Sequence, residues 1–225
     1  MTGRRTVLSW SGGKDCALAL HVLRERRQAP YALLTTVVEA TGAVSHHGIP
    51  ATLLAEQAAA TGLELVTVPL PDPCPDVEYA ARMRAALGSP RLAGLEAVAF
   101  GDLQLADVRA WREERLAQAS LVGEFPLFGR DTRAVAHAFL DLGFSAVVCA
   151  VDTEQLGADY LGRTYDRAFL RDLPDHVDPA GEHGEFHTVV TDGPVFAWPV
   201  RAVVDGVEDD GRFARARLRP VTPGR

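Results

Sequence analysis

The amino-acid sequence predicts an α/β protein with a doubly wound, mainly parallel β-sheet and a smaller C-terminal region. Short runs rich in β-branched residues alternate with stretches whose apolar residues recur at helical spacing, which is typical of a parallel sheet wrapped by helices. The run AVVCAV at residues 146–151 is apolar throughout, as expected for a strand buried on both faces. The chain has 225 residues, of which 47% are hydrophobic and 24% charged, as in an ordinary globular protein.

Four strand–helix units are predicted in the first half of the chain. The strands are expected at residues 6–10, 32–38, 65–68 and 97–100. The helices that follow them are expected at residues 16–28, 50–62, 77–87 and 106–119. The first helix carries Ala17, Leu20 and Leu23 on one face. Pro50 suits the first turn of the second helix and Gly62 suits its end. The proline-rich linker PLPDPCPD leads into the third helix.

The second half of the chain is predicted to contain fewer regular elements. Three of them, a strand, a helix and the last strong strand, are expected at residues 121–125, 132–142 and 146–151. After Asp152 glycine, aspartate and proline become frequent, so we expect a first domain at residues 1–150 and a C-terminal substrate region at residues 151–225. The end of the chain, with a DDG turn before RFARARL, predicts a terminal hairpin. Its alternating arginines are expected to form a solvated strand face, and an RNA contact is the alternative.

Composition and charge exclude several classes of protein. The net charge of −7 argues against a general nucleic-acid coat, because such a protein needs a basic face. The three cysteines form no CxxC pair, so neither a disulfide framework nor a zinc ribbon is predicted. The apolar runs are far shorter than a membrane span, and the apolar start is too short for a signal peptide. We therefore expect a cytoplasmic enzyme or binding protein with no membrane partner.

The N-terminal stretch VLSWSGGKDCALAL predicts a phosphate site. It enters a helix directly after an apolar strand, and the N-terminus of a helix binds anions through unpaired N–H groups and the positive end of its dipole. Gly12 and Gly13 permit close approach of a ligand to the backbone. Ser9 and Ser11 supply hydroxyl donors, and Lys14 supplies a positive charge. The stretch matches neither a Walker loop nor a dinucleotide fingerprint, and a ligand-free turn is the alternative.

A second informative stretch is VDPAGEHGEFHTVVTDGPVF. Its proline and glycines oppose a helix, so a loop is expected that enters a strand at residues 186–190. Glu182, Glu185 and His187 on such a loop could hold an amine, orient Mg²⁺ or move protons. His183 and His187 have the spacing of metal ligands, but no helix aligns them and no cysteine is near, so a metal site is the weaker interpretation. A plain polar loop is a further alternative.

Together these stretches resemble a known family. SGGKDC resembles the SGGxD[S] loop of the PP-loop ATP pyrophosphatases, which bind the β- and γ-phosphates of ATP and cleave between the α- and β-phosphates. GEHGEFHT followed by DGPVF is similar to the signature of the diphthine–ammonia ligase family within that group. Four other segments match that family, HHGIP at residues 46–50, GDLQLADVRAWRE at 101–113, PLFGRDT at 126–132 and LPDHVDP at 173–179. The resemblance implies a PP-loop, HUP-like Rossmann-type fold.

Three positions depart from the family pattern. Cys16 stands where the loop usually has serine, so a weak thiol donor takes the place of a hydroxyl. In the second signature His183 replaces asparagine, and Ala180 replaces a cysteine that often precedes it. The last two changes concern the end of the site at which the amide would form.

The resemblance implies an amide ligase that uses ATP and Mg²⁺. In this family ATP activates a carboxylate as an acyl-adenylate, pyrophosphate leaves, and ammonia attacks to give an amide. The residues that would hold the pyrophosphate are Ser9, Ser11, Gly12, Gly13, Lys14, Asp15 and Cys16. Lys14 would offset the negative charge that grows on the leaving group. Asp15 and Asp102 are the candidate Mg²⁺ ligands, and Asp102, with Gly101 at the end of the fourth strand, would face the reaction centre.

The adenine is expected at the end of the second strand. Ligands in open α/β sheets bind beyond the carboxyl ends of the strands, so the backbone of Thr36 and Val37 would carry the base. His46 and His47 lie on the following loop, where they would approach the nucleotide or form a solvent-exposed pair.

The second signature would form the wall that admits the acyl substrate and ammonia. This wall would consist of Glu182, Glu185, His187 and Thr188, and Glu185 would deprotonate ammonium. The residues expected to have catalytic roles are therefore Lys14, Asp15, Asp102, Glu182, Glu185 and His187.

The expected partners are ATP or AMP, ammonia, and a carboxylate that is either protein-borne diphthine or a small acid. A second copy of the chain is also a candidate partner, with which it would form a homodimer. Two other functions are considered. A nucleotide-binding regulator would hold ATP without turnover. A PP-loop enzyme that modifies RNA would need a catalytic cysteine pair or a basic domain, and the sequence contains neither.

Overall fold

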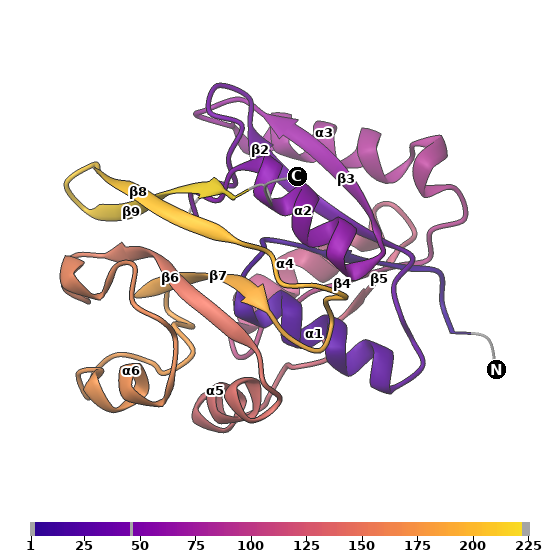
Figure 1. Ribbon diagram of the computed structural model, residues 1–225. Coiled ribbons are helices and arrows are strands. Elements are labelled where there is room, and N and C mark those ends of the chain that lie inside the picture. Colours follow the sequence, from indigo (N-terminus) through magenta and orange to yellow (C-terminus); the bar gives the residue numbers. More distant parts are fainter. Residues whose placement is uncertain (1–2, 46, 222–225) are drawn as a thin grey trace.

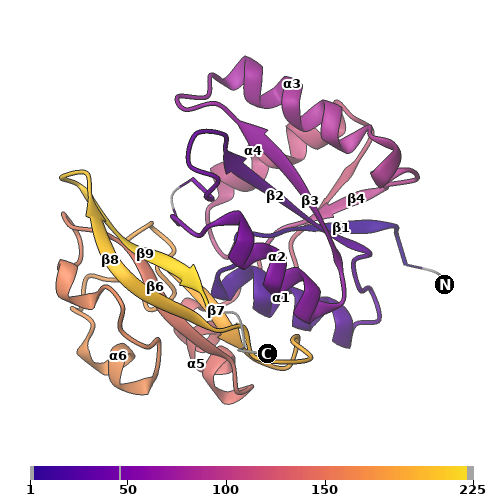
Figure 2. The same cartoon turned by 45° about the horizontal axis from the view of Figure 1, so that its top comes forward.

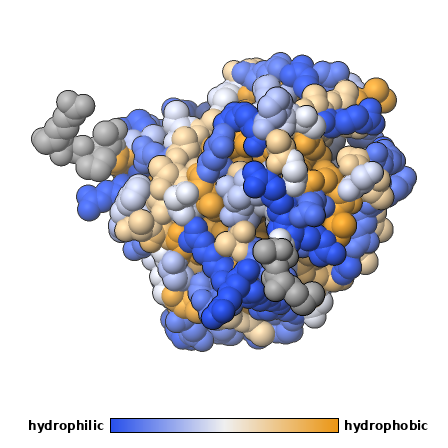
Figure 3. Space-filling model, turned by 90° about the vertical axis from the view of Figure 1, so that its right-hand side faces the viewer, coloured by the Kyte–Doolittle hydropathy of each residue, from blue (hydrophilic) through white to orange (hydrophobic). Residues whose placement is uncertain are grey.

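A computed structural model describes residues 3–45 and 47–221 of the chain. These residues form two β-sheets, and helix α1 (Lys14–Glu25) lies between them (Figure 1). No helix among the described residues is long and apolar enough to cross a membrane. On the face shown in Figure 3, hydrophobic residues form islands among hydrophilic ones.

The first sheet is parallel and contains five strands in the order β3-β2-β1-β4-β5. Its strands are β1 (Thr6–Ser9), β2 (Ala32–Val38), β3 (Glu64–Leu70), β4 (Ala97–Ala99) and β5 (Val122–Glu124). The helices that follow α1 are α2 (Ala51–Thr61), α3 (Asp76–Leu87), the short η1 (Pro90–Leu92) and α4 (Ala106–Ala117). Helices α1 and α2 cover one face of the sheet, and α3 and α4 cover the other (Figure 2). The predicted doubly wound α/β class is therefore confirmed.

Local sequence explains the bounds of α2. Pro50 is its N-cap, with φ −67° and ψ 143°, the extended conformation that a proline readily adopts. Gly62 is its C-cap in the left-handed region, with φ 74°, where a residue without Cβ is not strained. The N–H of Gly62 donates to the carbonyls of the last turn. The helix therefore ends where the sequence predicts.

The second sheet is antiparallel and contains four strands in the order β7-β6-β9-β8. Its strands are β6 (Ser145–Asp152), β7 (Phe186–Asp192), β8 (Ala202–Asp209) and β9 (Phe213–Pro220). The helices of this half are α5 (Thr132–Asp141), the short η2 (Ala158–Tyr160) and α6 (Arg167–Asp172). The predicted terminal hairpin is confirmed, since β8 and β9 pair along their whole length.

The placement of β6 corrects one expectation. The run at residues 146–151 is buried as predicted, but its strand pairs antiparallel with β7 and β9 and not with the parallel sheet. An apolar run indicates that both faces of a strand are buried, but it does not indicate whether the strand pairs in a parallel or an antiparallel sheet. Residue 150, where we expect a domain boundary, lies inside β6. The strands of the two sheets divide the chain between β5 and β6.

Two hydrophobic clusters hold the helices and the two sheets together. The smaller one joins the parallel sheet to α3 and α4, through Val98, Leu34 and Leu116. The larger one joins α1 and α2 to the second sheet, through Leu18 and Val189. Because α1 is packed on both sides, its N-terminus lies at the junction of the two halves of the chain.

Candidate active site

A cavity of about 740 Å³ lies at the carboxyl ends of β1 and β4. These strands are neighbours at the centre of the parallel sheet, where the strand order reverses. Open α/β sheets bind ligands at such a switch point, and the volume falls in the range of about 300–1,000 Å³ that is typical of ligand sites.

Both halves of the chain contribute to the cavity wall. The N-terminal half provides Ser9, Ser11, Asp15, Cys16, His47, Phe100, Gly101, Asp102, Leu105, Val108 and Arg112. The C-terminal half provides Asp152, Gly181, Glu182, His183, Gly184, His187, Arg212 and Phe213. The structure therefore brings the two sequence motifs together in one site.

The loop between β1 and α1 is held by a buried glutamine. Gln57 on α2 is fully buried. Its Nε2 donates to the carbonyls of Gly12, at 3.0 Å, and Val190, at 2.7 Å. Its Oε1 accepts from Nε1 of Trp10 at 2.9 Å, and the N–H of Val190 also donates to the Gly12 carbonyl. This network ties the loop to α2 and to β7 of the second sheet.

The two glycines face protein atoms, contrary to the expectation that they admit the ligand. Gly12 has φ +82°, and a Cβ there would lie 2.6 Å from a methyl group of Leu54. A Cβ on Gly13 would lie 3.0 Å from the carbonyl oxygen of Thr188. Neither glycine lines the cavity. The loop therefore packs closely against α2 and β7 at both positions, and Gly12 also needs its positive φ.

Lys14 also departs from its expected position. Its side chain is only 5% exposed and does not line the cavity. Its Nζ donates to Oδ2 of Asp15 at 2.9 Å and lies 5.5 Å from the ring centroid of Phe186. The first turn of α1 is fixed by β7, since the N–H of Lys14 donates to Oγ1 of Thr188. The positive charge of Lys14 thus pairs with the Asp15 carboxylate inside the protein and does not face the cavity.

The start of α1 lies at the cavity wall and has the features of an anion site. The N–H groups of Asp15 and Cys16 make no hydrogen bond to another described residue. Such N–H groups, at the positive end of the helix dipole, bind anions. Ser9 and Ser11 line the cavity beside them. A Cβ on Gly101 would lie 2.8 Å from the backbone carbon of Asp15, so β4 reaches this turn only because residue 101 is glycine.

Two carboxylates near this turn suit a divalent cation. Oδ1 of Asp15 is buried and has no hydrogen-bond partner among the described residues. Burial raises the pKa of the Asp15 carboxyl, Lys14 opposes this rise, and the charges of Asp102 and Asp178 add to it. Asp102 accepts from Nε of Arg112 at 2.7 Å.

The donor set at this position fits Mg²⁺ that enters with a nucleotide. Within residues 3–45 and 47–221 no cluster of three acidic, histidine or cysteine side chains suits a metal. Mg²⁺ in phosphate sites is commonly held by one or two carboxylates together with phosphates and water. Asp15 and Asp102 can supply those carboxylates.

Cys16 is a neutral thiol at the cavity wall. Its Sγ donates to the carbonyl of Gly13 at 3.1 Å and lies 3.7 Å from Oγ of Ser11. Burial raises its pKa to about 11. The thiol therefore occupies the place of the usual hydroxyl without adding a negative charge beside the anion site.

This environment predicts unequal reactivity of the cysteines. At pH 8 a thiol with a pKa of about 11 is about 0.1% thiolate, and only the thiolate reacts with iodoacetamide. We expect alkylation of the native protein at the half-exposed Cys74, while Cys16 and the buried Cys149 react only in denaturant. Peptide mass spectrometry measures each site. Labelling of Cys16 as fast as that of Cys74 would contradict a buried, neutral thiol.

Glu182 joins the second motif to the N-terminal half. Its Oε1 accepts from the N–H groups of Leu103, Gln104 and Leu105, at 3.2, 2.7 and 3.3 Å. Burial raises its pKa, and these backbone bonds oppose the rise. Glu182 lines the cavity as expected, and its bonds hold the loop between β4 and α4.

Glu185 points away from the cavity, which corrects its expected role as a base. It is 1% exposed and absent from the cavity wall. Its Oε1 accepts from the N–H of Asp178, and its Oε2 accepts from the N–H of His183, both at 2.9 Å. With both oxygens occupied inside the loop, Glu185 fixes the loop that presents Glu182.

The two halves also meet through a pair of imidazoles. His47 and His187 line the cavity, and their rings stack with centroids 4.3 Å apart. His46 lies outside the described residues. The structure thus places His47 beside the second motif.

The expected adenine position lies outside the cavity wall. Thr36 and Val37 do not line the cavity and pair with β3. β1 pairs with β2 only as far as Leu34. The edge of β2 that faces β1 therefore has no strand partner beyond that point among the described residues, and the expectation that a base binds this edge stays a prediction.

Sequence reasoning missed five polar or aromatic residues of the wall, Phe100, Arg112, Asp152, Arg212 and Phe213. Arg112 on α4 binds Asp102, and Arg212 binds the buried Asp152 with Nη2–Oδ2 at 2.9 Å. Phe213 follows Arg212 on the hairpin. Arg212 is the first arginine of RFARAR, the segment expected to be a solvated face. Arg212 is 57% exposed, like Arg217 at 56%, and its position at the turn, opposite the end of β6, is what brings it to the cavity wall.

Two family models match the two halves of the chain. The family model described as the diphthamide synthase N-terminal domain matches residues 4–120, and the diphthamide synthase C-terminal domain matches residues 131–213. Among curated proteins, no sequence matches the chain. A solved structure, a predicted subunit of tRNA methyltransferase from Methanocaldococcus jannaschii, matches with 20% identity and a TM-score of 0.41, over 63% of this chain and 77% of that chain.

Proposed function

The chain belongs to the diphthamide synthase family, and on that premise we propose that it is an ATP-dependent amide ligase. In the proposed reaction a carboxylate oxygen attacks the α-phosphorus of ATP. The bond from that phosphorus to the bridging oxygen breaks, and pyrophosphate leaves. Ammonia then attacks the acyl carbon, AMP leaves, and an amide remains after loss of a proton from nitrogen.

The proposal rests on one observation above the others. A nucleotide-sized cavity at the switch point of a parallel sheet is lined by Ser9 and Ser11 and by Asp15 and Cys16, whose N–H groups have no partner among the described residues. We propose that the pyrophosphate part of ATP binds the N–H groups of Asp15 and Cys16 and the hydroxyls of Ser9 and Ser11. These donors are fixed before the reaction by β7 and α2, so they can stabilise the charge of the leaving group without reorganisation.

The charge of the cavity supports a requirement for Mg²⁺. Four carboxylates line it, on Asp15, Asp102, Asp152 and Glu182. Among the described residues only two guanidinium groups line it, and each already binds an aspartate. ATP would add further negative charge, which a divalent cation on Asp15 and Asp102 would offset. The metal would supply charge neutralisation at the phosphates, and the protein groups would orient the nucleotide.

The reacting ends of the substrates would lie at the second motif. We propose that Glu182, His183 and His187 form the wall near the acyl group and ammonia, since all three line the cavity. His187 is the proposed group for proton transfer from ammonium, because Glu185 is buried within the loop. The carboxylate would be a protein-borne diphthine or a small acid, with no membrane involved.

The test is the identity of the products. The protein is incubated with ATP, Mg²⁺, ammonium and candidate carboxylates, and AMP, pyrophosphate and amide are quantified. The ligase predicts all three in equal amounts. ADP with phosphate, or amide formation without AMP, would contradict it. Tight ATP binding without any product would favour the second candidate, a regulator that holds ATP, which the withdrawal of Lys14 from the cavity supports.

Arg212 should contribute to nucleotide affinity. It provides one of the two cations of the wall, so we expect Arg212→Ala to weaken MgATP binding about tenfold, or about 1.4 kcal/mol, in a calorimetric titration. Arg217→Ala is the matched control, because Arg217 lies on the strand that follows Arg212, is ion-paired to Glu208 and is 56% exposed, but is outside the cavity wall. Equal affinities of the two variants would contradict a role for Arg212.

A further inference from the structure

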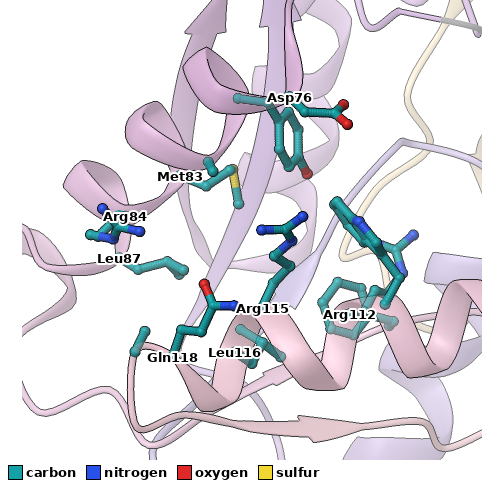
Figure 4. A pocket seen from close by; sticks show the side chains of 13 residues that line it. Asp76, Met83, Arg84, Leu87, Arg112, Arg115, Leu116 and Gln118 are labelled. Carbon is teal, nitrogen blue, oxygen red and sulfur yellow. The ribbon is translucent and has the colours of Figure 1, made fainter.

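A second hollow lies between α3 and α4, on the face of the parallel sheet opposite to α1. Its volume is about 80 Å³. Its apolar wall is formed by Tyr79, Met83, Leu87, Phe100, Trp111 and Leu116. Helix α3 contains no fully buried residue, and Trp111 remains 37% exposed. Both helices therefore leave apolar side chains only partly covered at this hollow (Figure 4).

Two arginines at the hollow lack a protein counterion. The side chains of Arg84 and Arg115 line it, and neither makes an ion pair or hydrogen bond with a residue in the described part of the chain. Other arginines of the same helices are paired, since Arg82 binds Glu78 and Arg109 binds Glu113. Figure 4 shows Arg115 extending from α4 into the space toward α3. Its guanidinium lies 5.5 Å from the ring centroid of Trp111.

The hollow has a net positive character. Three guanidinium groups line it, on Arg84, Arg112 and Arg115, against the single carboxylate of Asp76. Guanidinium groups beside aromatic and aliphatic side chains favour a ligand with an apolar body and an acidic group, because a carboxylate can accept two parallel N–H bonds from one guanidinium. The same groups would repel an ammonium ligand.

The hollow shares a wall with the nucleotide cavity. Phe100 and Arg112 line both spaces. The guanidinium of Arg112 lies 4.3 Å from the ring centroid of Phe100 and binds Asp102 on the other side. A ligand in the hollow would therefore contact the residue that holds Asp102.

We propose that the hollow is a second ligand site, for a small carboxylate that carries one aromatic ring. The ring lies against Met83, Leu87 and Trp111, and the carboxylate lies between Arg84 and Arg115. The hollow, at about 80 Å³, is smaller than the enclosed cavity of about 150 Å³ that holds one benzene molecule, so a ring bound there stays partly outside it. This site does not depend on the proposed ligase function.

The experiment uses the full chain labelled with 5-fluorotryptophan, which carries three reporters, Trp10, Trp111 and Trp198. Their ¹⁹F signals are assigned with Trp→Phe variants. The protein is titrated with 3-phenylpropanoate and, separately, with 3-phenylpropylammonium. We expect the acid to shift the Trp111 signal with half-saturation at or below about 1 mM and the cation to leave it unchanged.

Two variants locate the binding. Arg84→Glu/Arg115→Glu should weaken the response to the acid at least tenfold. Arg171→Glu is the matched control, since Arg171 is exposed on α6, and it should leave the response unchanged. No shift with the acid, an equal shift with the cation, movement of the Trp10 or Trp198 signal in place of Trp111, or an unchanged response of the double variant would each overturn the proposal.

Discussion

Gly101→Ala should reduce MgATP affinity at least tenfold. A Cβ at residue 101 would lie 2.8 Å from the backbone carbon of Asp15 and 2.9 Å from the backbone nitrogen of Cys16. Both atoms belong to the first turn of α1, so the methyl group can fit only if that turn moves. Because the N–H groups of the same two residues form the proposed phosphate site, the movement would misalign them. Overpacking of this kind also costs about 1–3 kcal/mol of stability.

The measurement is a calorimetric titration with MgATP, paired with a thermal unfolding curve. Gly3→Ala is the control, because the nearest atoms to a Cβ at residue 3 are 3.9 Å away, and it should match the unsubstituted protein. If Gly101→Ala bound MgATP with undiminished affinity, the turn of α1 would not be the phosphate site.

Gln57→Ala should be the most destabilising single substitution of a polar residue. It removes the acceptor of the Trp10 indole and the donor to two carbonyls, on Gly12 and Val190. The Gly12 carbonyl keeps its bond from the N–H of Val190. Each of the two other buried groups left unpaired costs about 1–3 kcal/mol, so the loss is at least about 2 kcal/mol. For a chain of this length that lowers Tm by roughly 4–8 °C.

Thermal unfolding measures this loss. The control is Gln28→Ala, which removes an exposed glutamine and should shift Tm by less than about 2 °C. A small shift for Gln57→Ala would mean that the loop between β1 and α1 is held by other contacts. MgATP affinity of the variant, measured below its Tm, should also fall, because the same network orients the loop.

The sequence predicts the fold where local signals decide it. The strands and helices of the parallel sheet follow from apolar runs and helical spacing, and the ends of α2 follow from Pro50 and Gly62. The sheet to which β6 belongs could not be predicted. That choice depends on pairing with β7 and β9, strands that begin 34 and 61 residues after the last residue of β6, and an apolar pattern does not specify such distant partners.

The positions of the candidate site residues are likewise predictable only where neighbouring residues in the sequence determine them. Ser11, Asp15 and Cys16 lie at the cavity because a strand–turn–helix unit fixes them locally. The position of Lys14 depends on its contacts with Phe186 and Thr188, which lie far along the chain. A lysine at the start of a helix predicts a phosphate contact, but these contacts hold Lys14 away from the cavity. The role expected for Glu185 follows from the family resemblance of the second signature, whereas the two backbone hydrogen bonds that occupy its carboxylate appear only in the folded loop.

The central claim is that the first turn of α1 holds the phosphates of ATP. The most direct test is a crystal structure with Mg²⁺ and an ATP analogue that cannot be cleaved between its α- and β-phosphorus atoms. We expect β- and γ-phosphate oxygens about 3 Å from the N–H groups of Asp15 and Cys16, with Mg²⁺ beside Asp15. A triphosphate bound elsewhere in the cavity, with those two N–H groups facing only solvent, would contradict it.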